Sequence, residues 1–179
     1  FRGNVSATGD RACYDESKRF GEMMTMLYIR TKGLDGRIIR IFNTYGPHMR
    51  KNDGRVISNF INQALERSDI TVYGDGSQTR SFCYVSDLVS GIMAVMFSDA
   101  TKGEVINLGN AEEYTMLELA KKIQQMTKTS SKIVFNDLPI DDPVKRKPDI
   151  SKAKKLVGWE PRVTVDEGLK KTIEYYKNS

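Results

Sequence analysis

Apolar positions along the chain change between helical spacing and short runs typical of strands. The first helical pattern covers residues 14–32 and ends at Gly33 and Gly36. Its apolar faces are rich in methionine and comprise Met23, Met24, Met26, Leu27 and Ile29. Residues 37–42, with the sequence RIIRIF, then indicate a buried strand. A helix followed by a strand, and then repeated, predicts an α/β fold.

The same alternation continues to the end of the chain. Further helices are predicted over 55–67, 86–97, 115–127, 150–157 and 165–176, and strands over 70–73, 78–85, 104–108 and 133–135. Residues 43–47 form a polar turn, and Ser86 with Asp87 is predicted to begin a helix. Residues 137–148 are charged and broken by prolines, which fits either a loop that closes over a ligand or a solvated connector.

Composition places the chain among globular proteins. It has 179 residues, of which 39% are hydrophobic and 28% charged, enough for one sizeable core. No apolar run approaches the ~20 residues that a membrane-spanning helix needs. Because the chain begins at Phe1 and not at methionine, we interpret it as a piece of a longer protein. Its compartment therefore stays open.

The formal net charge is +5, from 28 basic and 23 acidic residues. Nucleic acid could account for this charge, but no zinc-ligand spacing, RNA-binding aromatic motif or long basic tract accompanies it. A small anionic ligand explains the charge equally well, and we do not predict a nucleic-acid partner. Cys13 and Cys83 have neither a metal-ligand spacing nor the number needed for a disulfide framework, which mildly favours a reducing compartment.

Tyr14 and Lys18 lie four residues apart at the start of the first predicted helix. That spacing puts phenol and ammonium on one face, one turn apart, so that both can contact one ligand. A free phenol has a pKa of about 10 and is a poor base near neutrality, but a neighbouring cation favours phenolate. The pair is thus suited to proton transfer with a hydroxyl group. The same spacing also occurs by chance on solvated helix faces.

Two further groups of polar residues follow predicted strands. Asn43 and Thr44 come after the strand at 37–42, and ligands of open α/β sheets gather beyond the carboxyl ends of strands. Arg80 leaves a Gly-rich turn, from which a guanidinium can grip a phosphate through two parallel hydrogen bonds. Asn43 and Thr44 could equally belong to an ordinary turn, and Arg80 could equally be a surface arginine. His48, the one histidine, has no carboxylate or cysteine partner in sequence, and we do not predict it to be catalytic.

Seven segments in a fixed order carry a resemblance to a known family. They are RACYDESKR at 11–19, IFNTYGP at 41–47, NDGR at 52–55, SQTRSFCYVSD at 77–87, VINLGN at 105–110, RKPD at 146–149 and GWEP at 158–161. With them the whole chain resembles the carboxyl-terminal part of an extended short-chain dehydrogenase/reductase. Within that superfamily it is most similar to the UDP-glucuronate decarboxylases, mainly through the first, third and sixth segments.

The resemblance implies a doubly wound Rossmann-like sheet followed by a small α/β substrate-binding domain. Residues 1–45 would then hold the end of the dinucleotide-binding sheet with the Tyr-x-x-x-Lys helix, and residues 46–179 mainly the nucleotide-sugar-binding part. The family's Gly-rich turn and its Ser/Thr and Glu beside the sugar lie upstream of the matched part. Gly9-Asp10 also departs from the family's more usual Gly-Pro. We therefore expect this piece alone to bind NAD poorly and to be inactive.

The resemblance also implies a reaction and its residues. Tyr14 and Lys18 would be catalytic and would contact NAD, with Thr44 and Arg55 as further cofactor contacts. Asn43, Tyr73, Arg80 and Arg146 would bind the UDP-sugar, and the implied chemistry needs no metal. The products would be UDP-xylose and carbon dioxide, formed through a 4-keto intermediate. The family pairs its Tyr-x-x-x-Lys helix with that of a second subunit, which implies a homodimer.

Other functions stay open at this point. A nucleotide-sugar 4-epimerase or 4,6-dehydratase would share most of these residues, and a catalytically silent fragment could still bind UDP. Family members work in the cytoplasm or in the Golgi lumen, and nothing in the sequence chooses between the two.

Overall fold

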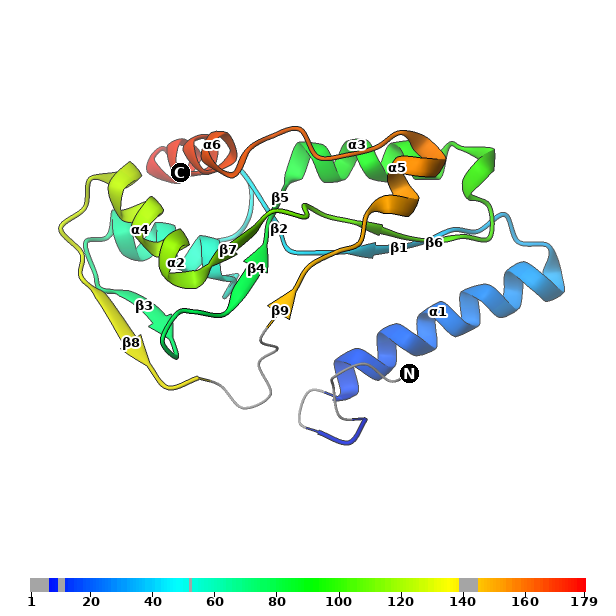
Figure 1. Cartoon of the computed structure of the whole chain (residues 1–179), viewed down its shortest axis with the longest axis horizontal. Helices are drawn as coiled ribbons and strands as arrows, with labels where there is room; N and C mark the ends of the chain where they lie inside the picture. Colours follow the sequence, from blue (N-terminus) through cyan, green and yellow to red (C-terminus); the bar gives the residue numbers. More distant parts are fainter. Residues whose placement is uncertain (1–6, 10–11, 52, 139–144) are drawn as a thin grey trace.

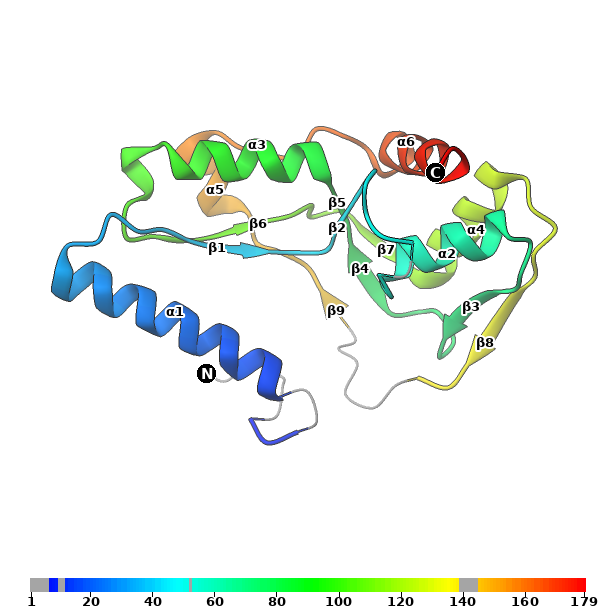
Figure 2. The same cartoon turned by 180° about the vertical axis from the view of Figure 1, so that it is seen from behind.

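A parallel pair of strands forms the centre of one half of the chain. In the computed structural model, β1 (Ile38–Ile41) pairs in parallel with β6 (Val105–Leu108), and Ile38 lies opposite Val105. Helix α3 (Val85–Met96) and helix α5 (Ser151–Val157) lie on one side of this pair, and helix α1 (Ala12–Lys32) lies on the other (Figures 1 and 2). Parallel strands with helices between them in sequence make this an α/β fold, as predicted.

The structure describes residues 7–9, 12–51, 53–138 and 145–179, with the backbone alone at 145 and 146. Among these residues, no helix combines the length and the apolar character that crossing a bilayer requires. The partner of β1 comes from residues 105–108, far beyond the predicted boundary at residue 45. The division at 45 stays a prediction.

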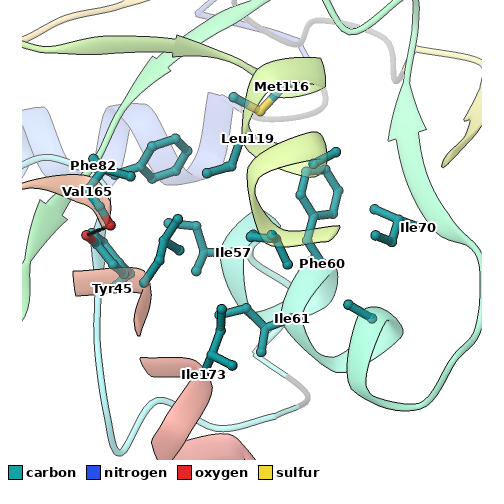
Figure 3. Close-up of a cluster of buried hydrophobic side chains, with 14 of the residues drawn as sticks. Tyr45, Ile57, Phe60, Ile61, Ile70, Phe82, Met116, Leu119, Val165 and Ile173 are labelled. Carbon is teal, nitrogen blue, oxygen red and sulfur yellow. Dashed lines mark hydrogen bonds between the residues drawn. The ribbon is translucent and has the colours of Figure 1, made fainter. Parts of the chain in front are cut away.

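Three helices and a second parallel pair of strands form the other half. The helices are α2 (Val56–Leu65), α4 (Met116–Thr127) and α6 (Val165–Lys177), and strand β3 (Ile70–Tyr73) runs parallel to β8 (Ile133–Asn136). Their apolar faces meet in a buried cluster, because helical spacing places one stripe of each helix inward (Figure 3). The cluster includes Tyr45, Ile57, Phe60, Ile61, Ile70, Phe82, Met116, Leu119, Val165 and Ile173. Burying one such aliphatic side chain is worth about 1.5–3 kcal/mol.

Short strands join the two halves. β2 (Thr44–Tyr45) pairs in parallel with β5 (Cys83–Tyr84), whereas β4 (Thr79–Ser81) lies between β7 (Glu113–Thr115) and β9 (Lys145–Arg146). The predicted strand over 78–85 is therefore two strands with different partners. The predicted turn at 43–47 likewise contains a strand, because its backbone pairs with β5.

Asp87 has a different role from the one that its position predicted. Helix α3 begins at Val85 without a side-chain cap, so the predicted start at Ser86 is late. The Asp87 carboxylate instead accepts hydrogen bonds from the backbone N–H groups of Arg162 and Val163, at 2.9 and 2.8 Å. Trp159 donates to the Asp87 carbonyl at 3.0 Å. This aspartate thus fastens the connection between α5 and α6 to the start of α3.

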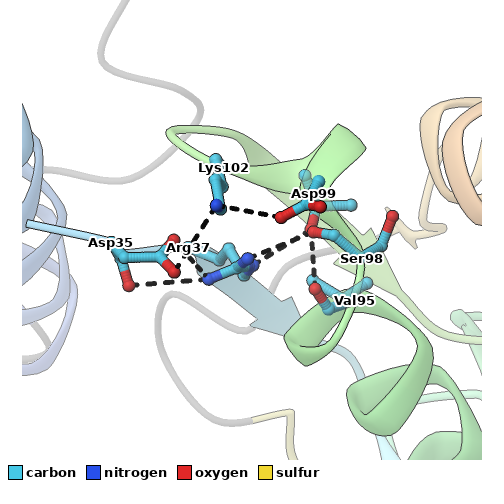
Figure 4. Close-up of polar contacts among 7 residues, drawn as sticks. Asp35, Arg37, Val95, Ser98, Asp99 and Lys102 are labelled. Atoms are coloured by element: carbon cyan, nitrogen blue, oxygen red, sulfur yellow. Dashed lines mark hydrogen bonds and ion pairs between the residues drawn. The ribbon is translucent and has the colours of Figure 1, made fainter.

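An arginine secures the entry to β1. The Arg37 guanidinium donates to the Asp35 carboxylate at 2.8 Å, to the Thr101 hydroxyl at 3.1 Å and to the Ser98 carbonyl at 3.1 Å (Figure 4). Lys102 lies 2.9 Å from Asp99 in the same group. These contacts join the start of β1 to the turn that follows α3, which holds the helix against the strand pair.

Candidate functional site

A cavity of about 420 Å³ lies where β2, α2, β3 and β4 come together. Five of the residues predicted to bind ligand line it, namely Asn43, Thr44, Arg55, Tyr73 and Arg80. Apolar side chains complete the wall, among them Met49, Phe60, Phe82 and Met116. A cavity with aromatic and aliphatic walls, a few amides and hydroxyls, and arginines suits a ligand that combines a flat ring with negative charge.

Asn43 and Thr44 are held at the carboxyl end of β1. The Asn43 side-chain amide donates to the Ser81 carbonyl at 3.2 Å, and the backbone carbonyl of Asn43 accepts from the Cys83 N–H at 2.8 Å. The Thr44 hydroxyl donates to the Phe42 carbonyl at 2.9 Å. Both side chains therefore have fixed orientations, as a site at the end of a parallel strand requires.

Arg80 is the most enclosed of the predicted site residues whose side chains the structure describes. Only 7% of its surface is exposed, and its Nη1 donates to the Thr79 carbonyl at 2.8 Å. Along the parallel pair of β4 and β9, Arg80 lies directly opposite Arg146. Two residues predicted to bind the same anionic ligand thus lie side by side on neighbouring strands. The side chain of Arg146 lies outside the described part of the chain.

Arg55 and Tyr73 lie at the more open side of the cavity. The Arg55 side chain is 63% exposed, and its Nε lies 3.0 Å from the Asp53 carboxylate, immediately before α2. Tyr73, at the end of β3, is 47% exposed, and its carbonyl accepts from the Gln78 amide at 2.8 Å. Of the NDGR segment, Asn52 lies outside the described residues.

Tyr14 and Lys18 are neighbours on α1, as their spacing predicted. The Lys18 Nζ lies 5.6 Å from the centre of the Tyr14 ring, and both side chains are exposed. Neither lines the cavity. Arg40 of β1 donates two hydrogen bonds to the Glu22 carboxylate, at 2.7 and 2.6 Å, which ties α1 to the strand. Because α1 and β1 run in opposite directions, the first turn of the helix and the carboxyl end of the strand both face the middle of the molecule (Figure 1).

Sequence reasoning missed several residues of the cavity. Asn59, Thr71 and Gln78 add polar groups to its wall. Asn59 lies four residues after Arg55, so helical spacing could have placed it on the same face. Gln78 belongs to the SQTR segment, two residues before Arg80. His48 does not line the cavity; its ring lies against Tyr175, with the ring centres 4.7 Å apart.

Two titratable groups beside the cavity are kept in their neutral forms. Burial, followed by repulsion from Cys83, raises the pKa of Tyr45 far above its usual value. Burial and the negative charge of Asp87 raise the pKa of the Cys83 thiol to about 12. A raised pKa suits neither group to act as a base or nucleophile near neutral pH, and we assign neither a catalytic role. In the described part of the chain, no group of three or more His, Cys, Asp or Glu side chains could hold a metal ion.

These features define an α/β protein with a ligand cavity beyond its parallel strands, and comparison with known proteins identifies its family. The sequence profile described as GDP-mannose 4,6 dehydratase matches residues 6–172. The chain belongs to this NAD-dependent epimerase/dehydratase family.

Within the family, the chain is similar to UDP-glucuronic acid decarboxylases. It is 51% identical over 175 residues to UDP-glucuronic acid decarboxylase 1 of Xenopus tropicalis. This match covers 98% of this chain and 41% of the relative. It is 53% identical over 178 residues to UDP-glucuronic acid decarboxylase 4 of Arabidopsis thaliana, covering 98% of this chain and 39% of the relative. The chain thus spans about two fifths of the length of these relatives.

Solved structures of epimerases share the fold. UDP-glucose 4-epimerase of Thermotoga maritima, solved with UDP-glucose, matches with a TM-score of 0.88 and 31% identity. This match covers 92% of this chain and 53% of the epimerase chain. UDP-glucuronic acid 4-epimerase of Bacillus cereus, solved with UDP-glucuronic acid and NAD, matches with a TM-score of 0.87 and 28% identity. The second match covers 98% of this chain and 57% of the epimerase.

Proposed function

We propose that the protein containing this chain is an NAD-dependent decarboxylase that converts UDP-glucuronate to UDP-xylose. The observation that carries the proposal is 51–53% identity to UDP-glucuronic acid decarboxylases over as much as 98% of the chain. The contact between Tyr14 and Lys18 and the arginine-containing cavity supply the chemical groups that such an enzyme needs.

The substrate would occupy the cavity. Asn43 and Arg80 would bind its phosphates, with Arg146 on the strand beside Arg80, and Tyr73 would pack against the uracil ring. A buried arginine supports this assignment, because its interaction with phosphate is little screened by solvent. The carboxylate of the sugar adds a further negative charge, for which Arg146 is our candidate partner.

The residues proposed to hold NAD are Tyr14, Lys18, Thr44 and Arg55. Tyr14 and Lys18 present a phenol and an ammonium together on an exposed helix face, which suits the hydroxyl groups of a ribose. When bound, NAD would accept a hydride from C4 of the sugar and return it in the last step. Structural neighbours of this chain bind NAD, among them the Bacillus cereus epimerase.

The chain's own residues would move the protons. As phenolate, Tyr14 takes the proton of the sugar 4-hydroxyl while Lys18 stabilises the negative charge on its oxygen. The resulting 4-keto sugar is a β-keto acid, so the electron pair of the bond to the carboxylate passes into the ketone and carbon dioxide leaves. The enolate is then protonated at C5 by a proton from water, which is the one proton that the overall reaction consumes. Tyr14 finally returns its proton to the 4-oxygen, which regenerates the phenolate.

The proposal includes a complete doubly wound sheet and a homodimer for the full-length protein. Support for a dimer comes from α1, in which no residue is buried. Its side chains at positions 20, 23 and 27 form an exposed apolar stripe, comprising Phe20, Met23 and Leu27, which are 61%, 51% and 45% exposed. Sedimentation velocity should give twice the subunit mass, and Met23→Glu should shift the protein toward the monomer. A monomeric wild type would contradict this part.

Product analysis tests the reaction. The full-length protein, incubated with UDP-glucuronate and NAD, should release carbon dioxide and UDP-xylose in equal amounts, and Tyr14→Phe should release neither. A UDP-sugar product that retains the carboxylate would refute decarboxylation. It would favour a 4-epimerase instead, the activity named for both structural neighbours.

The isolated chain calls for a separate measurement. It spans about two fifths of its decarboxylase relatives, so we propose that alone it binds UDP, binds NAD poorly and does not turn over. Calorimetric titration of residues 1–179 with UDP and, separately, with NAD tests this expectation. NAD binding of normal affinity would contradict it.

A further inference from the structure

One wall of the cavity depends on a helix that does not itself line the cavity. The wall consists of residues 46–51 and 53–55, between β2 and α2, and contributes Met49, Gly54 and Arg55. Its backbone is irregular, with positive φ angles of 66° at His48 and 80° at Gly54. The described residues of the wall belong to no helix or strand, so contacts from other elements are needed to set its position.

The C-terminal end of α6 supplies two of these contacts. The Tyr176 hydroxyl donates to the Met49 carbonyl at 3.0 Å, and its ring is buried with 3% of its surface exposed. The Tyr175 hydroxyl lies 3.2 Å from His48 Nδ1, and the two rings pack against each other. Burial, followed by the negative charge of Asp53, raises the pKa of Tyr176, so its hydroxyl remains a donor at neutral pH.

The N-terminal end of the same helix holds the strand that leads into the wall. The Tyr45 hydroxyl donates to the Val165 carbonyl at 3.3 Å (Figure 3). Close approach is possible because residue 168 is a glycine; a Cβ atom there would lie 2.1 Å from the Tyr45 oxygen. Helix α6 therefore contacts the segment 45–49 at both of its own ends. No residue of α6 lines the cavity.

We infer that Tyr175 and Tyr176 are positioning residues, which hold this wall where Arg55 and Met49 can contact the ligand. This inference rests on the proposed function for the identity of the ligand, a UDP-sugar with its cofactor. From the opposite side, the Asn62 amide of α2 donates to the Lys51 carbonyl at 2.7 Å. The wall is thus fastened between α2 and α6, and loosening the α6 side frees its first half.

The test uses Tyr175→Phe and Tyr176→Phe, separately, in the full-length protein. Each removes one hydroxyl and keeps the ring, so the packing is preserved. Thr172→Val is the matched control, because the Thr172 hydroxyl is buried in the same helix and donates to the Gly168 carbonyl, away from the wall. Thermal unfolding of each variant measures any change in the stability of the whole protein, so that it can be separated from local loosening of the wall.

Limited trypsin digestion measures how firmly the wall is held, independently of activity, because Arg50 and Lys51 are cleavage sites within it. Loss of one hydrogen bond should accelerate cleavage there roughly 3- to 10-fold in Tyr176→Phe. The KM for NAD, the ligand proposed for Arg55, should rise by a similar factor while kcat stays within about twofold. Thr172→Val should change neither quantity.

Cleavage at the wild-type rate in both tyrosine variants would overturn the inference. Equal acceleration in Thr172→Val, or faster cleavage with an unchanged KM, would overturn it as well. Failure of the proposed function is distinguishable, because the wild type would then lack decarboxylase turnover while the comparison of cleavage rates remained valid.

Discussion

The ammonium nitrogen of Lys18 lies 5.6 Å from the centre of the Tyr14 ring, one turn further along α1. Packing against other elements does not hold these side chains in place, since both are exposed. It follows from the four-residue spacing on a helix, which brings the two side chains to one face. A cation beside a phenol is therefore built into the helix itself.

Tyr14→Phe in the full-length protein should lower kcat by about 10²- to 10⁴-fold, because it removes the group that exchanges a proton with the sugar. Lys18→Met should lower turnover through loss of phenolate stabilisation and should also weaken NAD binding. Rates of UDP-glucuronate consumption and calorimetry with NAD measure these effects. Tyr28→Phe, which alters another exposed tyrosine of α1, is the control. Normal turnover by Tyr14→Phe would exclude the mechanism.

Arg80→Lys should weaken UDP binding by roughly 10- to 100-fold, since a lysine cannot form two parallel hydrogen bonds with phosphate. Calorimetric titration with UDP measures the loss, and thermal unfolding shows whether the buried lysine also destabilises the fold. Arg67→Lys is the matched control, because Arg67 is an exposed arginine just after α2. Unchanged UDP affinity in a folded Arg80→Lys protein would remove this residue from the site.

The ion pair between Glu22 and Arg40 predicts a pH dependence. The hydrogen bonds from Arg40 lower the pKa of Glu22 below its usual value. The pair therefore stabilises the fold at pH values above the ordinary glutamate pKa of about 4.3, and this contribution is lost as the pH falls through the lowered value. Glu22→Gln should cost about 1 kcal/mol or less at pH 7, because Arg40 is half exposed.

Urea unfolding of the wild type and of Glu22→Gln at a series of pH values measures this effect. The difference in unfolding free energy should shrink toward zero at the acid end of the series. Glu66→Gln, at an exposed glutamate at the end of α2, provides the comparison. A difference that stays constant with pH would mean that the charge of Glu22 is not what stabilises the contact.

Gly168→Ala should destabilise the protein by about 1–3 kcal/mol, because the new methyl group would overlap the Tyr45 side chain. Adding Tyr45→Phe removes the nearest atom, so the double variant should lose less stability than the sum of the single variants. Gly21→Ala is the control, since a Cβ atom there meets nothing within 4 Å and alanine favours the helix. Wild-type stability of Gly168→Ala would show that α6 can move away from Tyr45.

The sequence alone determined the elements whose signal is local. Helices α2, α4 and α6 occur within a residue or two of their predicted bounds, because the spacing of apolar residues reflects the helical repeat. Strands β1, β3 and β6 also agree with their apolar runs. The pairing of Tyr14 with Lys18 needed no tertiary information.

Only the tertiary structure decided what depends on distant partners. A two-residue strand such as β2 has no period to detect, and it exists because β5 lies beside it. The role of Asp87 is set by backbone N–H groups at 162 and 163. The cavity likewise unites Asn43, Arg55 and Arg80 from three separate segments of the chain. Packing between segments far apart in the chain, which no local pattern records, placed those three side chains together.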